Sequence, residues 1–333
     1  MTASLDLPVA DPELSEAVRH GLQSVESRLG SAVGQSDQLA DDASRHLITA
    51  GGKRVRPMLT LLAAQLGDAS NPAIVDAAAV VELTHLATLY HDDVMDSAPM
   101  RRGAPAAHQI WGNTVAILTG DLLFARASRI VADLGPEAVR IQAATFERLC
   151  LGQLHETLGP APGEDPVRHY LQVLADKTGS LIATAARFGA MFAGCSDQVV
   201  EVLMAYGERV GVAFQLADDV IDLASLPGES GKTPGTDLRE GVPTLPVLLA
   251  RRAAGGGDLD ATAVVALLDG DLSDDVLLAE AVVALREHSV TQQARDEANR
   301  WSAEAIEALD PLPVVPAKQA LRAFAEAVVL RTR

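Results

Sequence analysis

The chain has 333 residues, of which 48% are hydrophobic, so it can bury a large core. Its formal net charge of -18 argues against nucleic acid or an anionic membrane surface as the main partner, because both attract basic surfaces. The two cysteines provide no disulfide framework, and no apolar stretch reaches the roughly 18 residues needed to span a bilayer. We therefore expect a cytoplasmic protein with no membrane span.

Residues 1–12 carry acids and prolines instead of a basic segment followed by an apolar one. We therefore expect a disordered start and no signal peptide. Beyond it, apolar residues recur at helical spacing and do not alternate, which predicts helices and no strands there. These first predicted helices are 13–29, 37–50, 57–66 and 72–95. Gly51-Gly52 separates the second helix from the third.

A polar loop containing Gly and Pro is predicted at 100–108. The helices predicted after it are 113–134, 137–158, 166–195 and 197–225. A second loop, 226–246, holds four glycines and four prolines, and Gly255-Gly256-Gly257 forms a linker. The last predicted helices, both amphipathic, are 261–309 and 317–330. No shift in composition divides the chain, so we predict one all-α domain over 1–333, a large multi-helix bundle.

Three carboxylates stand at the end of the predicted helix 72–95, at Asp92, Asp93 and Asp96. Asp92 and Asp96 share a helix face, where like charges repel, and the helix dipole also disfavours negative charge at this end. An acidic run by itself is more often only a solvated helix end. A second D-D-x-x-D motif follows another apolar run and consists of Asp218, Asp219 and Asp222. The repeated pattern suggests two facing helices that share one cavity and bind hard divalent cations such as Mg2+.

Basic residues gather in loops that also carry glycine. The chain has only four lysines, and Lys53, Lys177 and Lys232 lie in such loops. The loops are G-G-K-R-V-R-P (51–57), R-R-G (101–103), K-T-G (177–179) and G-K-T-P-G (231–235). Each motif alone is more often a turn or a solvated loop. Together, in an acidic chain, they indicate a diphosphate that is neutralised by Lys and Arg on one side and by metal ions on the other.

These motifs resemble those of the trans-isoprenyl diphosphate synthases, also called polyprenyl synthetases. The matching segments are G-G-K-R-V-R-P (51–57), H-x-x-x-x-x-H-D-D-V-M-D (85–96), R-R-G-A-P-A-A-H (101–108), W-G-N-T-V-A-I-L-T-G-D (111–121), G-Q-L-H-E (152–156), K-T-G-S-L (177–181), A-F-Q-L-A-D-D-V-I-D (213–222) and G-K-T-P-G-T-D-L-R-E-G (231–241). The resemblance is specific because all eight motifs occur in order between residues 51 and 241.

The resemblance implies an all-α isoprenoid synthase fold with a central cavity, normally a homodimer, that joins isopentenyl diphosphate to an allylic diphosphate. It implies up to three Mg2+ ions per site when substrate is bound. The implied metal ligands are Asp92, Asp93, Asp96, Asp218, Asp219 and Asp222. The departing diphosphate is implied to take the proton, since no separate general base is evident.

The resemblance also divides the basic residues between the two substrates. Those implied to brace the allylic diphosphate are Arg101, Lys177 and Lys232, with Thr178 and Gln215 nearby. Those implied to bind isopentenyl diphosphate are Gly52, Lys53, Arg56, His85 and Arg102. His85 lies two helical turns before Asp92 and so shares its face, although a lone histidine is more often a core or surface residue. One accessory lysine of the family is replaced by Val242, for which we expect weaker phosphate contact without loss of activity.

Product length is expected to depend on the helix that carries the first motif. Its flank next to the aspartates has no aromatic residue at Val80, Thr84, Ala87 or Thr88. A Phe at Ala87 or Thr88 would block an apolar tunnel about 5 Å below the metal site. We therefore predict an all-trans product longer than twenty carbons, which would need a membrane or a carrier for release. Alternatively these residues only pack helices, and the floor is set by Phe124, Ile130 or Leu134.

Other functions are consistent with parts of this pattern. A shorter product would make the chain a farnesyl- or geranylgeranyl-type synthase. A terpene cyclase is also all-α, but it lacks the second D-D-x-x-D motif and the G-G-K-R-V-R-P loop. A non-catalytic subunit of a heteromeric synthase usually loses aspartates or basic residues that are present here.

Overall fold

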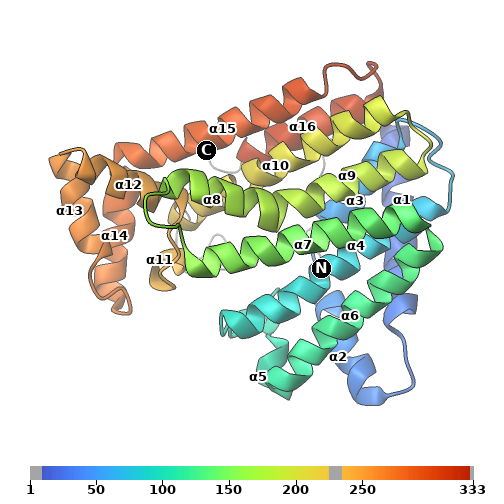
Figure 1. The fold of residues 1–333 in the computed structure, drawn as a ribbon, viewed down its shortest axis with the longest axis horizontal. Coiled ribbons are helices and arrows are strands. Elements are labelled where there is room, and N and C mark those ends of the chain that lie inside the picture. Colours follow the sequence, from blue (N-terminus) through green and yellow to red (C-terminus); the bar gives the residue numbers. More distant parts are fainter. Residues whose placement is uncertain (1–9, 225–234, 331–333) are drawn as a thin grey trace. The chain divides into compact units, whose positions relative to one another are not determined.

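The computed structural model describes residues 10–224 and 235–330. Within these ranges the chain is almost entirely helical (Figure 1), and the predicted all-α class is confirmed. The helices before the second loop are α1 (Pro12–Val33), α2 (Gln38–Thr49), α3 (Val55–Ala64), α4 (Ala73–Met95), α5 (Ala107–Trp111), α6 (Asn113–Asp133), α7 (Pro136–Leu158), α8 (Pro166–Leu174), α9 (Ser180–Phe192) and α10 (Asp197–Ala224). The remaining helices are α11 (Thr236–Arg239), which lies within the second predicted loop, α12 (Leu245–Gly255), α13 (Leu259–Leu268), α14 (Asp275–Glu287), α15 (Ser289–Ala308) and α16 (Pro316–Leu330).

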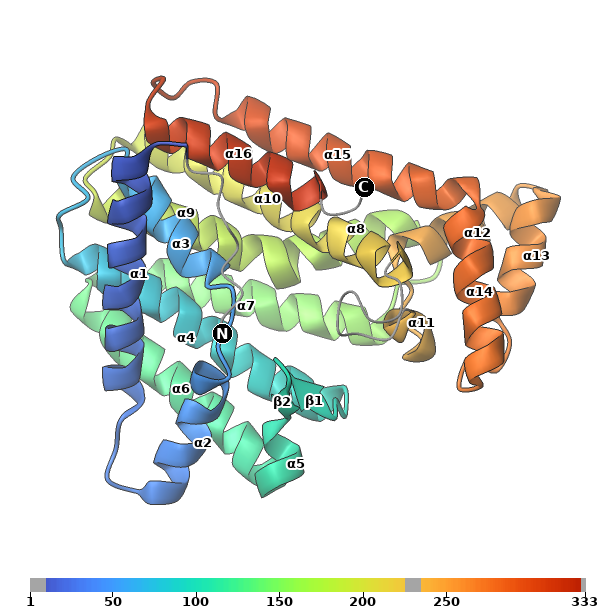
Figure 2. The same cartoon turned by 180° about the vertical axis from the view of Figure 1, so that it is seen from behind.

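Several predicted segments differ in detail, and the second loop contains the short helix α11. The loop 100–108 contains a two-stranded antiparallel hairpin, β1 (Met100–Arg101) and β2 (Ala104–Pro105), which Figure 2 shows beside α5. The segment 166–195 is interrupted by a π-helical turn, η1 (Ala175–Gly179), between α8 and α9. The segment 261–309 forms α13, α14 and α15, because Asp274 caps a new helix by accepting from backbone N–H groups.

Aspartates begin several of the helices. Their side chains accept hydrogen bonds from backbone N–H groups of the first turn, which otherwise have no partner. These caps are Asp11, Asp37, Asp165, Asp258 and Asp274. Part of the acidic excess of the chain therefore stabilises its helices.

The chain forms two compact units. The first comprises Met1–Glu147, Leu181–Gly207 and Ala308–Ala323, and the second comprises Arg148–Ser180, Glu208–Glu307 and Phe324–Arg333. In the first, α4 packs against α1, α3 and α6. In the second, α12, α13 and α14 share an apolar core that includes Leu268, Leu278 and Leu285. The single domain predicted from the sequence stays a prediction.

Helix α4 is the central element of the first unit. It is long and apolar enough to cross a membrane by length and composition, but 67% of its most apolar window is buried inside the structure. Core helices of soluble proteins have the same properties, so this is weak evidence for a membrane span. The burial of α4 on most sides also fixes the direction in which its last turn, with the first aspartate motif, points.

Candidate active site

The first aspartate motif lies at the C-terminal end of α4, and its three aspartates differ in exposure. Asp92 is partly exposed and Asp96 is exposed, whereas Asp93 is buried. Asp93 Oδ1 accepts a hydrogen bond of 2.6 Å from Arg101 Nε, and its Oδ2 is buried with no hydrogen-bond partner among the described residues. Burial raises the pKa of Asp93, and the neighbouring Arg101 opposes this shift. The hairpin is thus tied to the end of α4 through a predicted substrate-binding arginine.

The turn of this hairpin carries Arg102. Arg102 and Gly103 both have positive φ, 55° and 78°, as a two-residue hairpin turn requires. The Arg102 guanidinium donates to the carbonyl oxygens of Leu47 and Gly51. A Cβ at Gly52, whose φ is +151°, would lie 2.8 Å from Arg102 Cζ, so the predicted glycine is needed for this close approach.

Arg54 lies in the G-G-K-R-V-R-P loop, and no role is predicted for it from the sequence. It has left-handed backbone geometry, with φ of 48°, and is 9% exposed. Its guanidinium donates to Glu82 Oε1 at 2.7 Å and to Glu26 Oε1 at 2.5 Å. These ion pairs attach the loop to α4 and α1. Arg54 therefore holds the loop in position through contacts with other protein side chains.

Arg56 and His85 are partly buried and form a basic cluster with Arg102, which is also partly buried. Burial lowers the pKa of Arg56 to about 10, so Arg56 stays protonated at neutral pH. Burial also lowers the pKa of His85 well below its usual value, and the surrounding arginines strengthen this effect. Arg56 Nε is buried and has no hydrogen-bond partner among the described residues. Lys53, from the same loop, is exposed. Excess positive charge with an unsatisfied buried donor is suited to an anionic ligand.

The second aspartate motif, on α10, repeats the arrangement of the first. Asp218 and Asp222 are partly exposed, whereas Asp219 is buried and accepts a hydrogen bond from the Tyr170 hydroxyl. Burial raises the pKa of Asp219 well above its usual range; the Tyr170 hydrogen bond opposes this, and nearby Asp237 adds to it. Tyr170 carries no motif signal and was missed in the sequence.

The predicted K-T-G loop is not a loop. Lys177 and Thr178 lie in the π-helical turn η1, a feature that is common at functional sites. Lys177 Nζ donates to Glu156 Oε2 at 2.5 Å, and Thr178 Oγ1 is 3.5 Å from Gln215 Oε1 on α10. The structure therefore brings predicted diphosphate-binding residues next to the second motif.

Two residues hold this turn in place. A Cβ at Gly152 would lie 2.8 Å from the backbone nitrogen of Lys177, which explains the glycine of the G-Q-L-H-E motif. Arg148 donates to Asp176 Oδ1 at 2.7 Å and to Glu208 Oε1 at 2.6 Å.

Two remaining predictions concern the second loop. Lys232 lies outside the described residues, and its role stays a prediction. The backbone N–H of Val242 donates to the carbonyl oxygen of Asp237, and its side chain provides no cation at this position.

The residues predicted to control product length all lie on the side of α4 that faces the core. Val80, Thr84 and Ala87 are buried and Thr88 is partly buried. Thr84 Oγ1 accepts a hydrogen bond of 2.6 Å from Gln142 Nε2 on α7. The alternative floor residue Phe124 stacks on Phe146, with ring centroids 3.9 Å apart. Their control of product length stays a prediction.

The carboxylates fit a divalent cation that is completed by a ligand. Among the described residues, no three His, Cys, Asp or Glu side chains are already arranged to hold a metal. Each motif instead presents two partly or fully exposed aspartates, while its middle one is bound by Arg101 or Tyr170. Mg2+ commonly takes one or two protein carboxylates and completes its octahedron with water and phosphate. Direct ligation by Asp93 and Asp219 stays a prediction.

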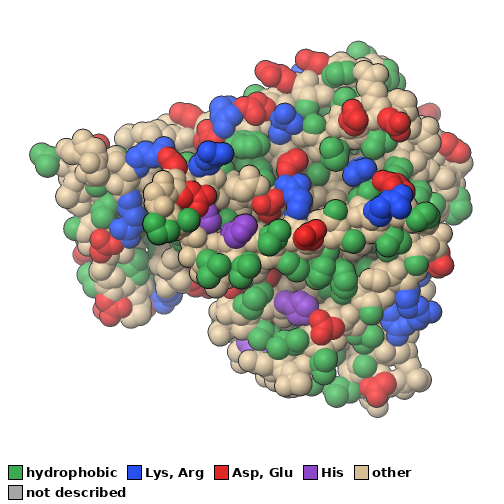
Figure 3. All heavy atoms as spheres, in the orientation of Figure 1, with side chains coloured by type: hydrophobic (Ala, Val, Ile, Leu, Met, Phe, Trp, Pro, Cys, Tyr) green, Lys and Arg blue, Asp and Glu red, His purple; other side chains and the backbone are tan. Residues whose placement is uncertain are grey.

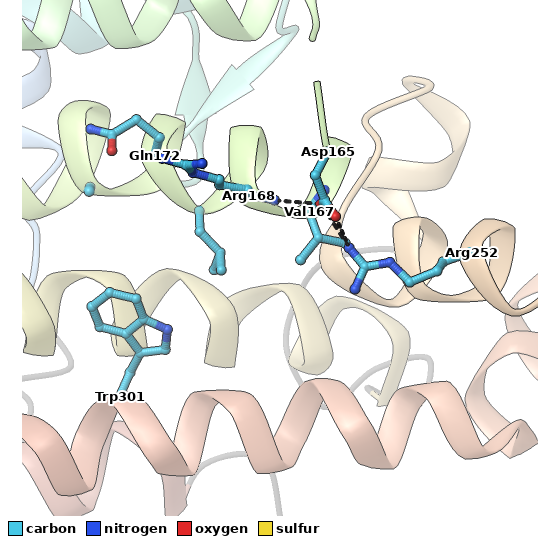
Figure 4. A pocket seen from close by; sticks show the side chains of 8 residues that line it. Asp165, Val167, Arg168, Gln172, Arg252 and Trp301 are labelled. Atoms are coloured by element: carbon cyan, nitrogen blue, oxygen red, sulfur yellow. Dashed lines mark hydrogen bonds and ion pairs between the residues drawn. The ribbon is translucent and has the colours of Figure 1, made fainter. Parts of the chain in front are cut away.

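Figure 4 shows a pocket of 420 Å³ in the second unit. Its lining residues are Asp165, Val167, Arg168, Leu171, Gln172, Ala175, Arg252 and Trp301. Arg252 forms an ion pair of 2.7 Å with Asp165 at its edge. None of the predicted site residues lines this pocket, so it is not the candidate active site.

The helical fold, the two D-D-x-x-D motifs and the partly buried basic cluster agree with the prenyl-transferring class that the resemblance in the sequence implies. The polyprenyl synthetase family model matches residues 37–264. This chain therefore belongs to the polyprenyl synthetase family, and the resemblance seen in the sequence is confirmed. The family match decides against the terpene cyclase alternative.

Three similar proteins illustrate the range of the family. A nonaprenyl diphosphate synthase of Mycobacterium tuberculosis (strain ATCC 25618 / H37Rv) is 48% identical over 332 residues, 99% of this chain and 98% of the relative. A heptaprenyl diphosphate synthase component 2 of Geobacillus stearothermophilus is 35% identical over 91% of this chain and 93% of its own length. The crystal structure of geranylgeranyl pyrophosphate synthase from Corynebacterium glutamicum, complexed with calcium and isoprenyl diphosphate, has a TM-score of 0.85 and 42% identity, covering 97% of this chain and 98% of that one.

Proposed function

We propose that this chain is a Mg2+-dependent polyprenyl diphosphate synthase. It condenses isopentenyl diphosphate with an allylic diphosphate and extends the product to an all-trans chain longer than twenty carbons. The observation that carries the proposal is the partly buried cluster of Arg56, Arg102 and His85, in which Arg56 Nε is buried without a hydrogen-bond partner among the described residues. A diphosphate would supply the acceptors and negative charge that this cluster lacks.

The two substrates are assigned to different residues. Lys53, Arg56 and Arg102 hold the diphosphate of isopentenyl diphosphate, and Gly52 leaves room for the Arg102 guanidinium. His85, neutral at pH 7, offers a hydrogen bond without adding charge. The residues proposed for the allylic diphosphate are Arg101, Lys177, Thr178, Gln215 and Lys232.

Asp92, Asp96, Asp218 and Asp222 are the aspartates placed to hold metal, and we propose three Mg2+ ions in the loaded enzyme. Bound Mg2+ would supply the charge neutralisation that lets the diphosphate leave. The allylic carbon–oxygen bond breaks, and its electron pair departs with the diphosphate. The isopentenyl double bond then forms the new carbon–carbon bond, and a proton passes to the released diphosphate. A structure similar to this chain was obtained with calcium and isoprenyl diphosphate, which supports a divalent metal at this site.

The activity test uses the purified chain alone. It is incubated with Mg2+, farnesyl diphosphate and labelled isopentenyl diphosphate, and the hydrolysed products are sized. We expect turnover that stops when Mg2+ is chelated, with products above twenty carbons. A folded, metal-loaded homodimer without turnover would instead indicate a subunit of a heteromeric synthase, as the name of one relative describes for that protein.

Product length has a separate test at Ala87. The nonaprenyl relative supports a long product, whereas the similar geranylgeranyl synthase structure represents the shorter alternative. Ala87 is buried on α4 one turn before the aspartates, so Ala87→Phe would place a ring across the proposed tunnel. We expect shorter products with turnover retained. Ala87→Ser, which keeps the volume small, is the control; an unchanged product from folded Ala87→Phe would place the floor elsewhere.

We also propose that the enzyme acts in the cytoplasm as a homodimer. Exposed apolar side chains in each unit support a partner surface, because monomeric soluble proteins seldom expose contiguous apolar patches to water. On α6 these are Ile117 and Leu118, and on α7 they are Leu151, Leu154 and Leu158. Figure 3 shows hydrophobic side chains, in green, over the face along which α7 runs.

A further inference from the structure

The carboxylate of Glu82 lies inside the basic cluster. Glu82 is 2% exposed in the middle of α4, one turn before His85. A buried carboxylate costs several kcal/mol unless it is paired and hydrogen-bonded. Glu82 meets this requirement through arginines from two separate segments, the G-G-K-R-V-R-P loop and the hairpin turn.

One oxygen of Glu82 serves both arginines. Its Oε1 accepts a hydrogen bond of 2.7 Å from Arg54 and lies 3.9 Å from the Arg102 guanidinium. Arg54 is fully used by protein partners, since it also binds Glu26 and the carbonyl oxygen of Ile48. The side chain of Arg102 is 16% exposed, and its guanidinium remains close to Glu82.

The cluster would be unstable without a countercharge. Burial lowers the pKa of Arg102, as it does that of Arg56, and Glu82 opposes the shift at both residues. Of the neighbouring carboxylates, Glu82 therefore does most to keep the Arg56 and Arg102 guanidinium groups protonated, as binding of a diphosphate requires. Glu26 pairs with Arg54 as well, but 46% of its side chain is exposed, and its charge raises the pKa of Arg102 less than the charge of Glu82 does.

We infer that Glu82 is a positioning residue of the isopentenyl diphosphate site. It holds Arg54 and Arg102 in place and supplies the countercharge that keeps Arg56, Arg102 and His85 together before the diphosphate binds. This inference rests on the proposed function and concerns only one of the two substrates. It assigns Glu82 no contact with substrate.

The test is Glu82→Gln, which keeps the side-chain shape and removes the charge. We expect the KM for isopentenyl diphosphate to rise by about tenfold or more, because a buried partner of charged groups is lost. The KM for the allylic diphosphate should change by less than about twofold, since Glu82 holds none of its proposed ligands. The matched control is Glu26→Gln, where the same Arg54 loses an exposed partner and the KM should change by less than about threefold.

Two further measurements keep the result interpretable. Glu82→Asp retains the charge and should recover part of the affinity; it replaces Glu82→Gln if that variant does not fold. Calorimetric titration with isopentenyl diphosphate reads binding directly, so the inference is tested even if the wild-type chain shows no turnover. An unchanged KM in folded Glu82→Gln, or an equal rise for both substrates, would overturn the inference. So would a lower KM, which simple removal of a negative charge near an anion would produce.

Discussion

At the scale of single residues, the two aspartate motifs share one design. The middle aspartates, Asp93 and Asp219, are 1% and 3% exposed, and each is bound by a side chain from another element. The first and last aspartates of each motif are more exposed. A carboxylate that is buried and bound in this way fixes the backbone of its helix turn, which orients the neighbouring carboxylates.

This design predicts a role for Tyr170. Tyr170→Phe removes the hydroxyl that binds Asp219 and leaves a buried carboxylate short of a donor. A hydrogen bond to a charged group contributes about 1.5–3 kcal/mol, so we expect kcat/KM for the allylic substrate to fall by about tenfold to a hundredfold. The Mg2+ concentration for half-maximal activity should also rise.

The matched control is Tyr206→Phe. The Tyr206 hydroxyl is buried and donates to the carbonyl oxygen of Leu321, but it has no part in either motif. Its loss should lower thermal stability and leave the Mg2+ requirement unchanged. A Mg2+ requirement that is the same in Tyr170→Phe and in the wild type would contradict the positioning role.

At the scale of elements, close helix approach depends on glycine. A Cβ at Gly120 on α6 would collide with His91 Nε2 and lie 3.1 Å from the carbonyl oxygen of Ala87, both on α4. The glycine of the W-G-N-T-V-A-I-L-T-G-D motif therefore lets α6 pack tightly beside the turn that precedes Asp92. This contact explains a motif to which the sequence alone assigned no role.

Gly120→Ala should separate α6 from α4. Overpacking costs about 1–3 kcal/mol, which exceeds the gain of about 1 kcal/mol in helix propensity, so we expect a lower free energy of unfolding. Gly30→Ala is the control, because nothing lies within 4 Å of a Cβ at Gly30 in helix α1. That variant should be neutral or slightly more stable. Denaturant unfolding measures both, and equal stability of the two variants would rule out the packing argument.

Element prediction from periodicity was accurate for the long helices, and weaker where tertiary contacts shape the backbone. The segments 72–95 and 113–134 match α4 and α6 within about a residue. The π-helical turn at Ala175–Gly179 was missed, because an inserted residue leaves the apolar pattern of the flanking helices unchanged. The hairpin at 100–105 was also missed, since its two-residue strands are too short to show alternation.

At the scale of the whole molecule, we expect the chain to form a homodimer through the exposed leucines of α7. Leu151, Leu154 and Leu158 follow one another on one face of α7, at 42%, 50% and 72% exposure. Leu154→Glu places a charge in the middle of this stripe and should convert a dimer to monomers. Light scattering after gel filtration measures the change in mass.

The control for the dimer test is Leu259→Glu. Leu259 is 82% exposed at the start of α13 and is not part of the α7 stripe. This variant should keep the wild-type mass. A dimeric Leu154→Glu would show that this stripe is not the interface, and a monomeric wild type would refute the homodimer itself.

The sequence by itself determined the helical class and the family, and it predicts most residues of the candidate site. Those signals are local: helical periodicity, the spacing within D-D-x-x-D, and basic residues next to glycine. Only the tertiary structure decided which residues support them. Arg54 meets Glu82 across 28 positions, and Tyr170 meets Asp219 across 49. No local pattern encodes such pairs, because burial and packing of distant segments choose the partner that each buried charge must have.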